Sequence, residues 1–332
     1  MIPTTFFLIV GSIFTSTALI LCNKKVMTTY NFGCPTFLTS YHFVLSFILL
    51  HILGKMKFFE ISSAVPTISA WYLGLFGVVS IVAMNFNLKL NSIGFYQLSK
   101  LCNIPCMVIY KYFFFNQKTP LNTLGSLGIL LIGLCLFTVN DVQFNIIGSV
   151  VAALGVITTT VYQTQTQSYQ KQYGISGTQL NYCIGIPQFT LGFLAASFIE
   201  THGTNNIFDH QFQTIEIVLI LSTGLLALVG NVISFSLIGK AGPVTFQVVG
   251  HVKTMLIFIF GLIMFPATQE SSAQFRKKIL GLCISMVGVC LYTVFELKNK
   301  EVDRIKNLRR EENEVETLSL EKTPDSVFKQ AV

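Results

Sequence analysis

Ten stretches of the sequence are apolar over a length that matches the hydrocarbon core of a lipid bilayer, and this pattern constrains the fold more than any other feature. A helix needs about 20 predominantly apolar residues to cross that core. Only 11% of the residues are charged, and most of these lie outside the stretches. We therefore predict an all-α membrane protein with ten transmembrane helices. The expected spans are 5–23, 36–54, 66–88, 94–115, 120–139, 145–166, 178–199, 215–239, 243–265 and 278–296.

The basic residues of the loops predict how the chain is oriented. The first span is too long for a signal peptide and lacks a small-residue cleavage site, so we expect it to be retained. Cytosolic loops carry an excess of Lys and Arg. The short loops of the two sides tie at six basic residues each, but the tail at 297–332 adds eight to one side. We predict that both termini are cytosolic.

Two lysines, Lys100 and Lys253, remain inside predicted spans after the loops and the tail are counted. A charged lysine at the centre of a bilayer costs roughly 2.5–3.5 kcal/mol on insertion scales. Every acidic residue lies in a loop, at the end of a span or in the tail, so no carboxylate is at the right depth to pair with either lysine. Buried charges need a partner. We therefore predict that the partner is an anionic ligand.

The two lysines stand in similar segments 150 residues apart. Residues 95–115 can be laid on residues 245–265 without a gap, so that Gln97 falls on Gln247. Lys100 and Asn103 then occupy the same third of the span as Gly250 and Lys253. This similarity predicts two repeats, 1–140 and 141–296, with a site at their interface and a flexible charged tail at 297–332.

Polar residues around the lysines complete the candidate site. Tyr96, Lys100 and Asn103 share one face of a helix, and Gly250 leaves space one turn before Lys253. A lysine ammonium binds phosphate as a point charge with three donors. The side chains that can add directional hydrogen bonds are Tyr96, Gln97, Asn103, Gln247 and Thr254.

Each of these residues also has a structural interpretation. The polar side chains can simply join helices, and the lysines can be neutral or reach outward. We expect His251 to be a packing histidine and Lys111 to snorkel to the interface. Asn85, Asn87, Asn91 and Asn231 can line a cavity or connect helices. The polar run at 158–167 ends a span and is expected to avoid lipid.

Other classes of site have little support in the sequence. The eight cysteines are scattered without metal-ligand spacing, so we expect neither a metal site nor a cofactor. No set of Ser, His and Asp, and no carboxylate pair, shares one depth, so we do not expect an enzyme. The tail contributes no net charge and no basic patch interleaves with aromatic residues, which disfavours nucleic acid as a partner.

Three motifs carry a resemblance to a known family. They are the LCNK sequence at 21–24, the GFYQLSK sequence at 94–100 with Pro105, and the GPVT sequence at 242–245 with GHVKT at 250–254. Together they make residues 5–296 resemble the nucleotide-sugar and triose-phosphate translocators of the drug/metabolite transporter superfamily. The resemblance implies ten helices in two inverted five-helix repeats, and exchange of a phosphorylated solute for phosphate or a nucleoside monophosphate.

The resemblance also implies roles for particular residues. The phosphate-binding lysines of the triose-phosphate branch match Lys100 and Lys253, but the arginine that follows the second lysine there is Thr254 here. Loss of the bidentate guanidinium argues against a compact divalent phosphate. The lysine–threonine pair is similar to the branch that carries UDP-sugars. Two further polar positions of the plastid carriers fall on Met84 and Gly230, whereas the neighbouring Asn85 and Asn231 match.

We therefore expect an antiporter of the Golgi or endoplasmic reticulum membrane that exchanges a cytosolic UDP-sugar for luminal UMP by alternating access. Two alternatives stay open: an organellar exchanger of sugar phosphate for phosphate, and a membrane scaffold or receptor that transports nothing. The sequence does not determine which sugar and base are carried, and a homodimer is compatible with it.

Overall fold

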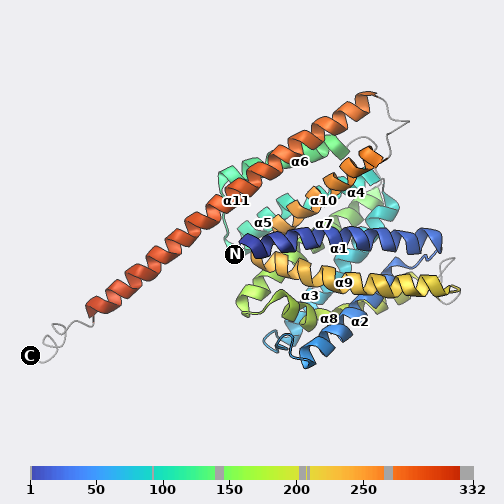
Figure 1. Ribbon diagram of the computed structural model, residues 1–332, viewed down its shortest axis with the longest axis horizontal. Helices are drawn as coiled ribbons and strands as arrows, with labels where there is room; N and C mark the ends of the chain where they lie inside the picture. Colours follow the sequence, from blue (N-terminus) through green and yellow to red (C-terminus); the bar gives the residue numbers. More distant parts are fainter. Residues whose placement is uncertain are drawn as a thin grey trace, which may run out of the picture.

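The computed structural model describes residues 2–91, 93–138, 146–201, 207, 210–264 and 272–321, and within these it contains helices and no strand (Figure 1). The helices are α1 (Ile2–Thr29), α2 (Pro35–Lys55), α3 (Thr67–Leu90), α4 (Ile93–Leu101), α5 (Asn103–Phe115), α6 (Leu121–Thr138), α7 (Ile146–Gln172), α8 (Gly177–Ile199), α9 (Thr214–Ala241), α10 (Pro243–Met264) and α11 (Ser272–Glu321). The predicted all-α class is confirmed.

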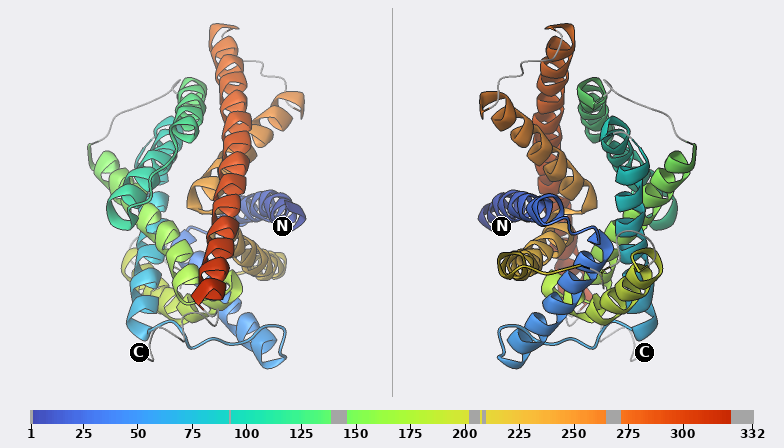
Figure 2. Two further views of the ribbon diagram at one scale, coloured as in Figure 1. Left: turned by 90° about the vertical axis from the view of Figure 1, so that its left-hand side faces the viewer. Right: turned by 90° about the vertical axis from the view of Figure 1, so that its right-hand side faces the viewer.

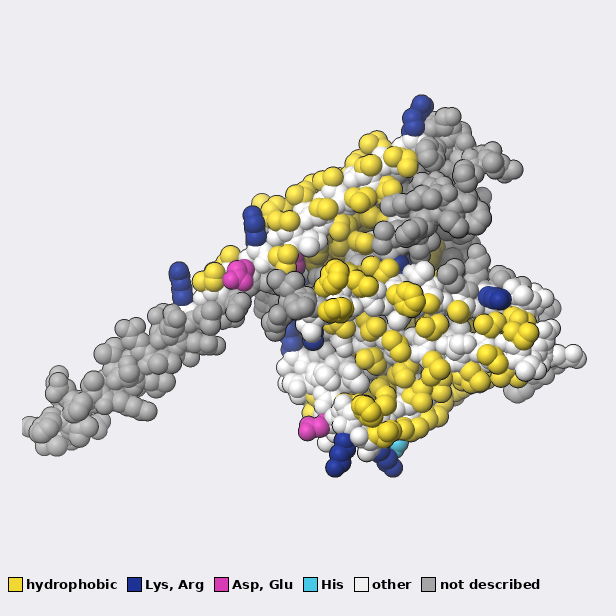
Figure 3. All heavy atoms as spheres, viewed as in Figure 1, with side chains coloured by type: hydrophobic (Ala, Val, Ile, Leu, Met, Phe, Trp, Pro, Cys, Tyr) yellow, Lys and Arg dark blue, Asp and Glu magenta, His cyan; other side chains and the backbone are white. Residues whose placement is uncertain are grey.

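The surface of the bundle is that of a multi-pass membrane protein. Among the described residues, seven helices are long and apolar enough to cross a membrane. Large apolar side chains such as Phe14, Leu225 and Leu280 are more than half exposed. Figure 3 shows hydrophobic side chains covering the flank formed by α1, α9 and α11, with Lys and Arg at its margins. A soluble protein avoids apolar patches of this extent, whereas lipid accepts them.

The helices pack in pairs that join the first half of the chain to the second. The most extensive contacts are α6 with α11, α3 with α7, α2 with α8, and α1 with α9 (Figures 1 and 2). Glycines allow α6 and α11 to approach closely, because a Cβ on Gly133 would overlap the backbone of Ser285. α1 begins and α11 ends on the same side of the bundle (Figure 1). The helix of α11 continues through much of the predicted tail to Glu321.

The predicted span at 94–115 is helical except for a one-residue turn at Cys102, whose backbone dihedrals stay in the helical region (φ −64°, ψ −16°). It is divided into α4 and α5 by a turn at Cys102, whose backbone N–H donates to the carbonyl of Ser99 (3.1 Å). Pro105 explains the break, because its ring excludes the carbonyl of Leu101 four residues earlier and its nitrogen has no hydrogen to donate. Transporters commonly place their sites at such discontinuous helices. Lys100 lies in the last turn before this break.

A carboxylate from the second half of the chain caps a helix of the first half. Glu200 is 7% exposed, and its two oxygens accept hydrogen bonds from the backbone N–H groups of Thr36 (2.7 Å) and Phe37 (2.8 Å). The first N–H groups of a helix have no acceptor within the helix, and negative charge is favoured there. Glu200 therefore stabilises the start of α2 and holds it against the end of α8.

We expect Glu200→Gln to lower the free energy of unfolding by about 1–2 kcal/mol, because the neutral amide has one acceptor oxygen and no charge. Thermal unfolding of the purified protein in detergent measures this change. Glu60→Gln is the matched control, since Glu60 is exposed in the connection after α2. An equal melting temperature for the two variants would show that the cap contributes nothing to stability.

Candidate substrate site

Lys100 of α4 and Lys253 of α10 lie near enough to each other for their charges to interact. The charge of Lys100 acts on Lys253, and His251 lies within the field of both lysines. Lys253 Nζ donates to Ser16 Oγ of α1 (2.7 Å), and Lys100 Nζ lies 5.2 Å from the centroid of the Tyr96 ring. Neither ammonium pairs with a carboxylate in the part of the chain that the structure describes. Two neighbouring positive charges without a counter-ion attract an anion.

Local structure sets the depth of each lysine. α10 begins at Pro243, directly after Gly242, whose φ of 98° is open to glycine but strained for other residues. Lys253 follows ten residues later, about 15 Å along the helix. Lys100 lies in the last turn of α4, next to the break that Pro105 causes. The start of α10 therefore fixes the position of Lys253, and the end of α4 fixes that of Lys100.

Several polar groups near the lysines have no partner among the described residues. Asn103 is 2% exposed and its Oδ1 accepts no hydrogen bond, and the Nε2 of the buried His251 is also without a partner. A buried polar group that is left unsatisfied costs about 1–3 kcal/mol. A Cβ added at Gly250 would meet no atom within 4 Å. Open space and unsatisfied polar groups beside two cations are suited to an oxygen-rich anionic ligand.

The polar run of α7 faces the interior, as the sequence predicted. Gln163 Oε1 accepts a hydrogen bond from Gln247 Nε2 of α10 (3.0 Å). Thr160 and Thr164 are each 3% exposed, and within the described residues their hydroxyls have no hydrogen-bond partner. The run therefore avoids lipid, and it connects the site to one end of α7.

The remaining predicted residues are placed less closely. The side chains of Gln97 and Thr254 lie outside the described residues, although both positions are helical. Asn85 on α3 and Asn231 on α9 are half-buried, and in the described part of the molecule neither bonds to Lys100 or Lys253.

Sequence reasoning left the role of one residue near this site undecided and missed another residue. The asparagine of α3 that contacts α4 is Asn87, which is fully buried and donates from Nδ2 to Ser99 Oγ (2.7 Å). Ser16 was missed, because a single serine in an apolar helix usually bonds to its own backbone. The only available signal was that an unpaired lysine needs an oxygen acceptor somewhere in the bundle.

Comparison with known proteins shows what the chain is similar to. The model described as the Triose-phosphate Transporter family matches residues 5–293. The chain is 35% identical over 312 residues to UDP-xylose transporter 2 of Arabidopsis thaliana, covering 92% of this chain and 87% of the relative. It is 29% identical over 285 residues to UDP-rhamnose/UDP-galactose transporter 1 of the same plant, covering 85% of this chain and 80% of the relative.

One solved structure shares the fold. A protein crystal structure aligns with a TM-score of 0.66 over 89% of this chain and 98% of that chain, at 13% sequence identity. At this identity the likeness concerns the arrangement of the helices alone.

Proposed function

The chain belongs to the triose-phosphate transporter family, and on that premise we propose that it transports a nucleotide sugar, exchanging a UDP-sugar for UMP across an internal membrane. The observation that supports the proposal is the pair of lysines, Lys100 and Lys253, whose charges act on each other and which pair with no carboxylate among the described residues. A nucleotide sugar carries phosphate groups whose negative charge can pair with these lysines, and so does UMP.

The lysines hold the phosphates in this mechanism, and the polar residues around them bind the rest of the ligand. Asn103 and Thr254 add hydrogen bonds to the phosphates, whereas Tyr96, Gln97 and Gln247 contact the sugar or the base. Gly250 keeps space open beside Lys253. Asn85 and Asn231 belong to the wider lining of the same cavity. Thr254 in place of an arginine favours an extended diphosphate over a compact triose phosphate.

The unpaired charges make exchange nearly obligatory. Alternating access requires an occluded state, in which both lysines are shut away from water. Without an anion that state carries two uncompensated charges and costs several kcal/mol. The empty carrier therefore returns slowly, and a carrier loaded with UMP returns fast.

Helix packing supports a two-repeat architecture for this mechanism. If α4 and α5 are counted as one span, a shift of five spans along the chain exchanges α1 with α7 and α3 with α9. The α1–α9 contact then becomes the α7–α3 contact. The same shift exchanges α2 with α8 and α6 with α11, so those two contacts are unchanged. Repeats of five spans, 1–140 and 141–296, necessarily have opposite orientations in the membrane. The site then lies where the repeats meet. In this arrangement both termini are cytosolic, the membrane is that of the Golgi or endoplasmic reticulum, and a homodimer is compatible with the fold.

The test is exchange by the purified protein in liposomes that have been preloaded with UMP. UDP-xylose is the first labelled substrate to offer, because three relatives at 35% identity are named UDP-xylose transporters. Uptake of a UDP-sugar that disappears without internal UMP is the expected result. Uptake of triose phosphate into phosphate-loaded vesicles, or no uptake of any solute in the panel, would reject the proposal.

A further inference from the structure

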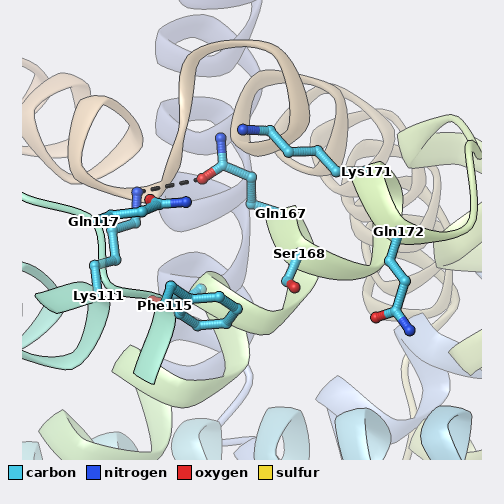
Figure 4. A pocket seen from close by; sticks show the side chains of 8 residues that line it. Lys111, Phe115, Gln117, Gln167, Ser168, Lys171 and Gln172 are labelled. Carbon is cyan, nitrogen blue, oxygen red and sulfur yellow. Dashed lines mark hydrogen bonds between the residues drawn. The ribbon is translucent and has the colours of Figure 1, made fainter. Parts of the chain in front are cut away.

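A cavity of about 310 Å³ lies apart from the central lysines, between the C-terminal ends of α5 and α7 (Figure 4). Small-molecule sites have volumes of roughly 300–1,000 Å³, so this cavity has room for part of a ligand. The residues that line it are Lys111, Phe115, Gln117, Thr164, Gln167, Ser168, Lys171 and Gln172. Two of these lining residues are lysines, none is acidic, and the others include three glutamines.

The two lysines, Lys111 and Lys171, lie on either side of Gln167 (Figure 4). Lys111 Nζ donates to Gln167 Oε1 (3.2 Å), so the lysine that the sequence predicted to snorkel contacts α7. Figure 4 shows the side chains of Lys111 and Lys171 directed toward Gln167 from opposite sides. Gln167 accepts through its oxygen and retains an amide group that can donate. These three side chains are therefore rich in donors, which is the composition of an anion site.

Thr164 provides an independent sign of a ligand. This residue lines the cavity, is 3% exposed, and its hydroxyl has no hydrogen-bond partner among the described residues. Thr160 lies one turn deeper on α7 in the same state. Burying a hydroxyl without a hydrogen-bond partner costs free energy, so a ligand that hydrogen-bonds to these two hydroxyls would be stabilised.

One face of α7 leads from the cavity toward the central lysines. Lys171, Ser168, Thr164 and Thr160 are spaced by three or four residues, so they form one face of the helix. Gln163, beside Thr164, bonds to Gln247, which precedes Lys253 by six residues, or about 9 Å along α10. An anion that leaves the cavity along this face meets hydroxyl and amide groups before it reaches the lysines.

We propose that the cavity is an outer anion site, at which Lys111 and Lys171 capture the phosphate groups of the substrate before they pass to Lys100 and Lys253. This inference rests on the proposed transport function. The ends of α5 and α7 lie on the side that the predicted topology assigns to the cytosol, so the site receives the incoming nucleotide sugar. A lipid phosphate is the other source of the same chemistry, and the experiment separates the two.

The test replaces Lys111 and Lys171 together by glutamine, which keeps the length of the side chains and removes both charges. The control is Lys118→Gln, because Lys118 is exposed near the same end of the bundle and does not line the cavity. Initial rates of exchange are measured in UMP-loaded vesicles of phosphatidylcholine. The vesicles are first separated by the orientation of the protein, so that substrate is offered to one known side. We expect the KM for UDP-sugar offered on the cavity side to rise about 3- to 10-fold, with kcat within about twofold of the parent. The KM on the opposite side stays unchanged.

Three results would overturn the inference. They are parental kinetics in the double variant, an equal change on both sides of the membrane, and a fall in kcat at constant KM. The measurement is repeated with one-fifth phosphatidylserine, and a defect confined to these vesicles would assign the cavity to lipid. Gln172→Cys provides a readout that does not require transport. UMP is expected to slow its reaction with a maleimide, and the loss of this protection in the double variant is part of the expected result.

The two readouts also separate the inference from the proposed function. If the parent exchanges no nucleotide sugar but UMP protects the introduced thiol of the Gln172→Cys variant, the outer anion site stands and the transport proposal fails. If the parent exchanges UDP-sugars and UMP gives no protection, the transport proposal stands and the outer site fails.

Discussion

Lys253→Met is expected to reduce exchange of UDP-sugar for UMP by about 30-fold or more. Removing one partner of a buried charge contact costs about 2–5 kcal/mol, and each 1.4 kcal/mol is a factor of ten. Methionine retains most of the volume of the lysine stem, so the packing around α1 and α10 is preserved. Only the ammonium is lost, and with it the hydrogen bond to Ser16.

The same variant is expected to be at least as stable as the parent without ligand. A charge inside the membrane is unfavourable, and methionine removes it. We therefore expect an equal or higher melting temperature in detergent and the loss of the stabilisation that UMP gives to the parent. Lys240→Met, at the exposed end of α9, serves as the control for both measurements. Exchange by Lys253→Met at the rate of this control would remove Lys253 from the site.

The all-α class and the long apolar helices, seven of which among the described residues could cross a membrane, were the most predictable part of the fold, because lipid requires such helices. The break in the fourth span was not predictable. Pro105 divides α4 from α5, whereas Pro187 lies inside α8 without ending it. A membrane helix tolerates proline when its neighbours satisfy the freed carbonyl, and the sequence does not reveal those neighbours. The same proline signal therefore has two structural outcomes in one chain.

The two lysines of the candidate site could be singled out in the sequence for an electrostatic reason. Lys100 and Lys253 were the cations left over when loops and tail were counted, and the structure places them within each other's field. Their neutral partners were not predictable, because hydrogen-bonding residues in membrane helices are as often structural as functional. The sequence left open whether Asn87 lines a cavity or joins helices, and it did not indicate that Ser99 and Gln167 are the partners of Asn87 and Lys111. Such contacts depend on how helices rotate against each other, which hydropathy does not report.

Pro105→Ala is the second change with a large expected effect, because the break between α4 and α5 orients the site. Alanine restores the N–H that can donate to the carbonyl of Leu101, and it removes the clash with that carbonyl. The two helices are then expected to join into one. Lys100 and Asn103 lie on either side of Cys102, so a continuous helix changes the direction of one relative to the other.

We expect Pro105→Ala to raise the melting temperature in detergent and to lower exchange by at least about tenfold, since a displacement of 1 Å can cost about 100-fold in a positioned site. Thermal unfolding and counterflow of UDP-sugar on the same preparation measure the two effects. Pro187→Ala is the control, because it removes a proline from a helix that is already continuous, and its exchange should stay within about threefold of the parent. A Pro105→Ala protein that is more stable and exchanges at the parental rate would show that the break is only a packing feature. If the break serves the site, the variant should be more stable and slower than the parent. A variant that is both less stable and slower would show instead that the proline supports the fold.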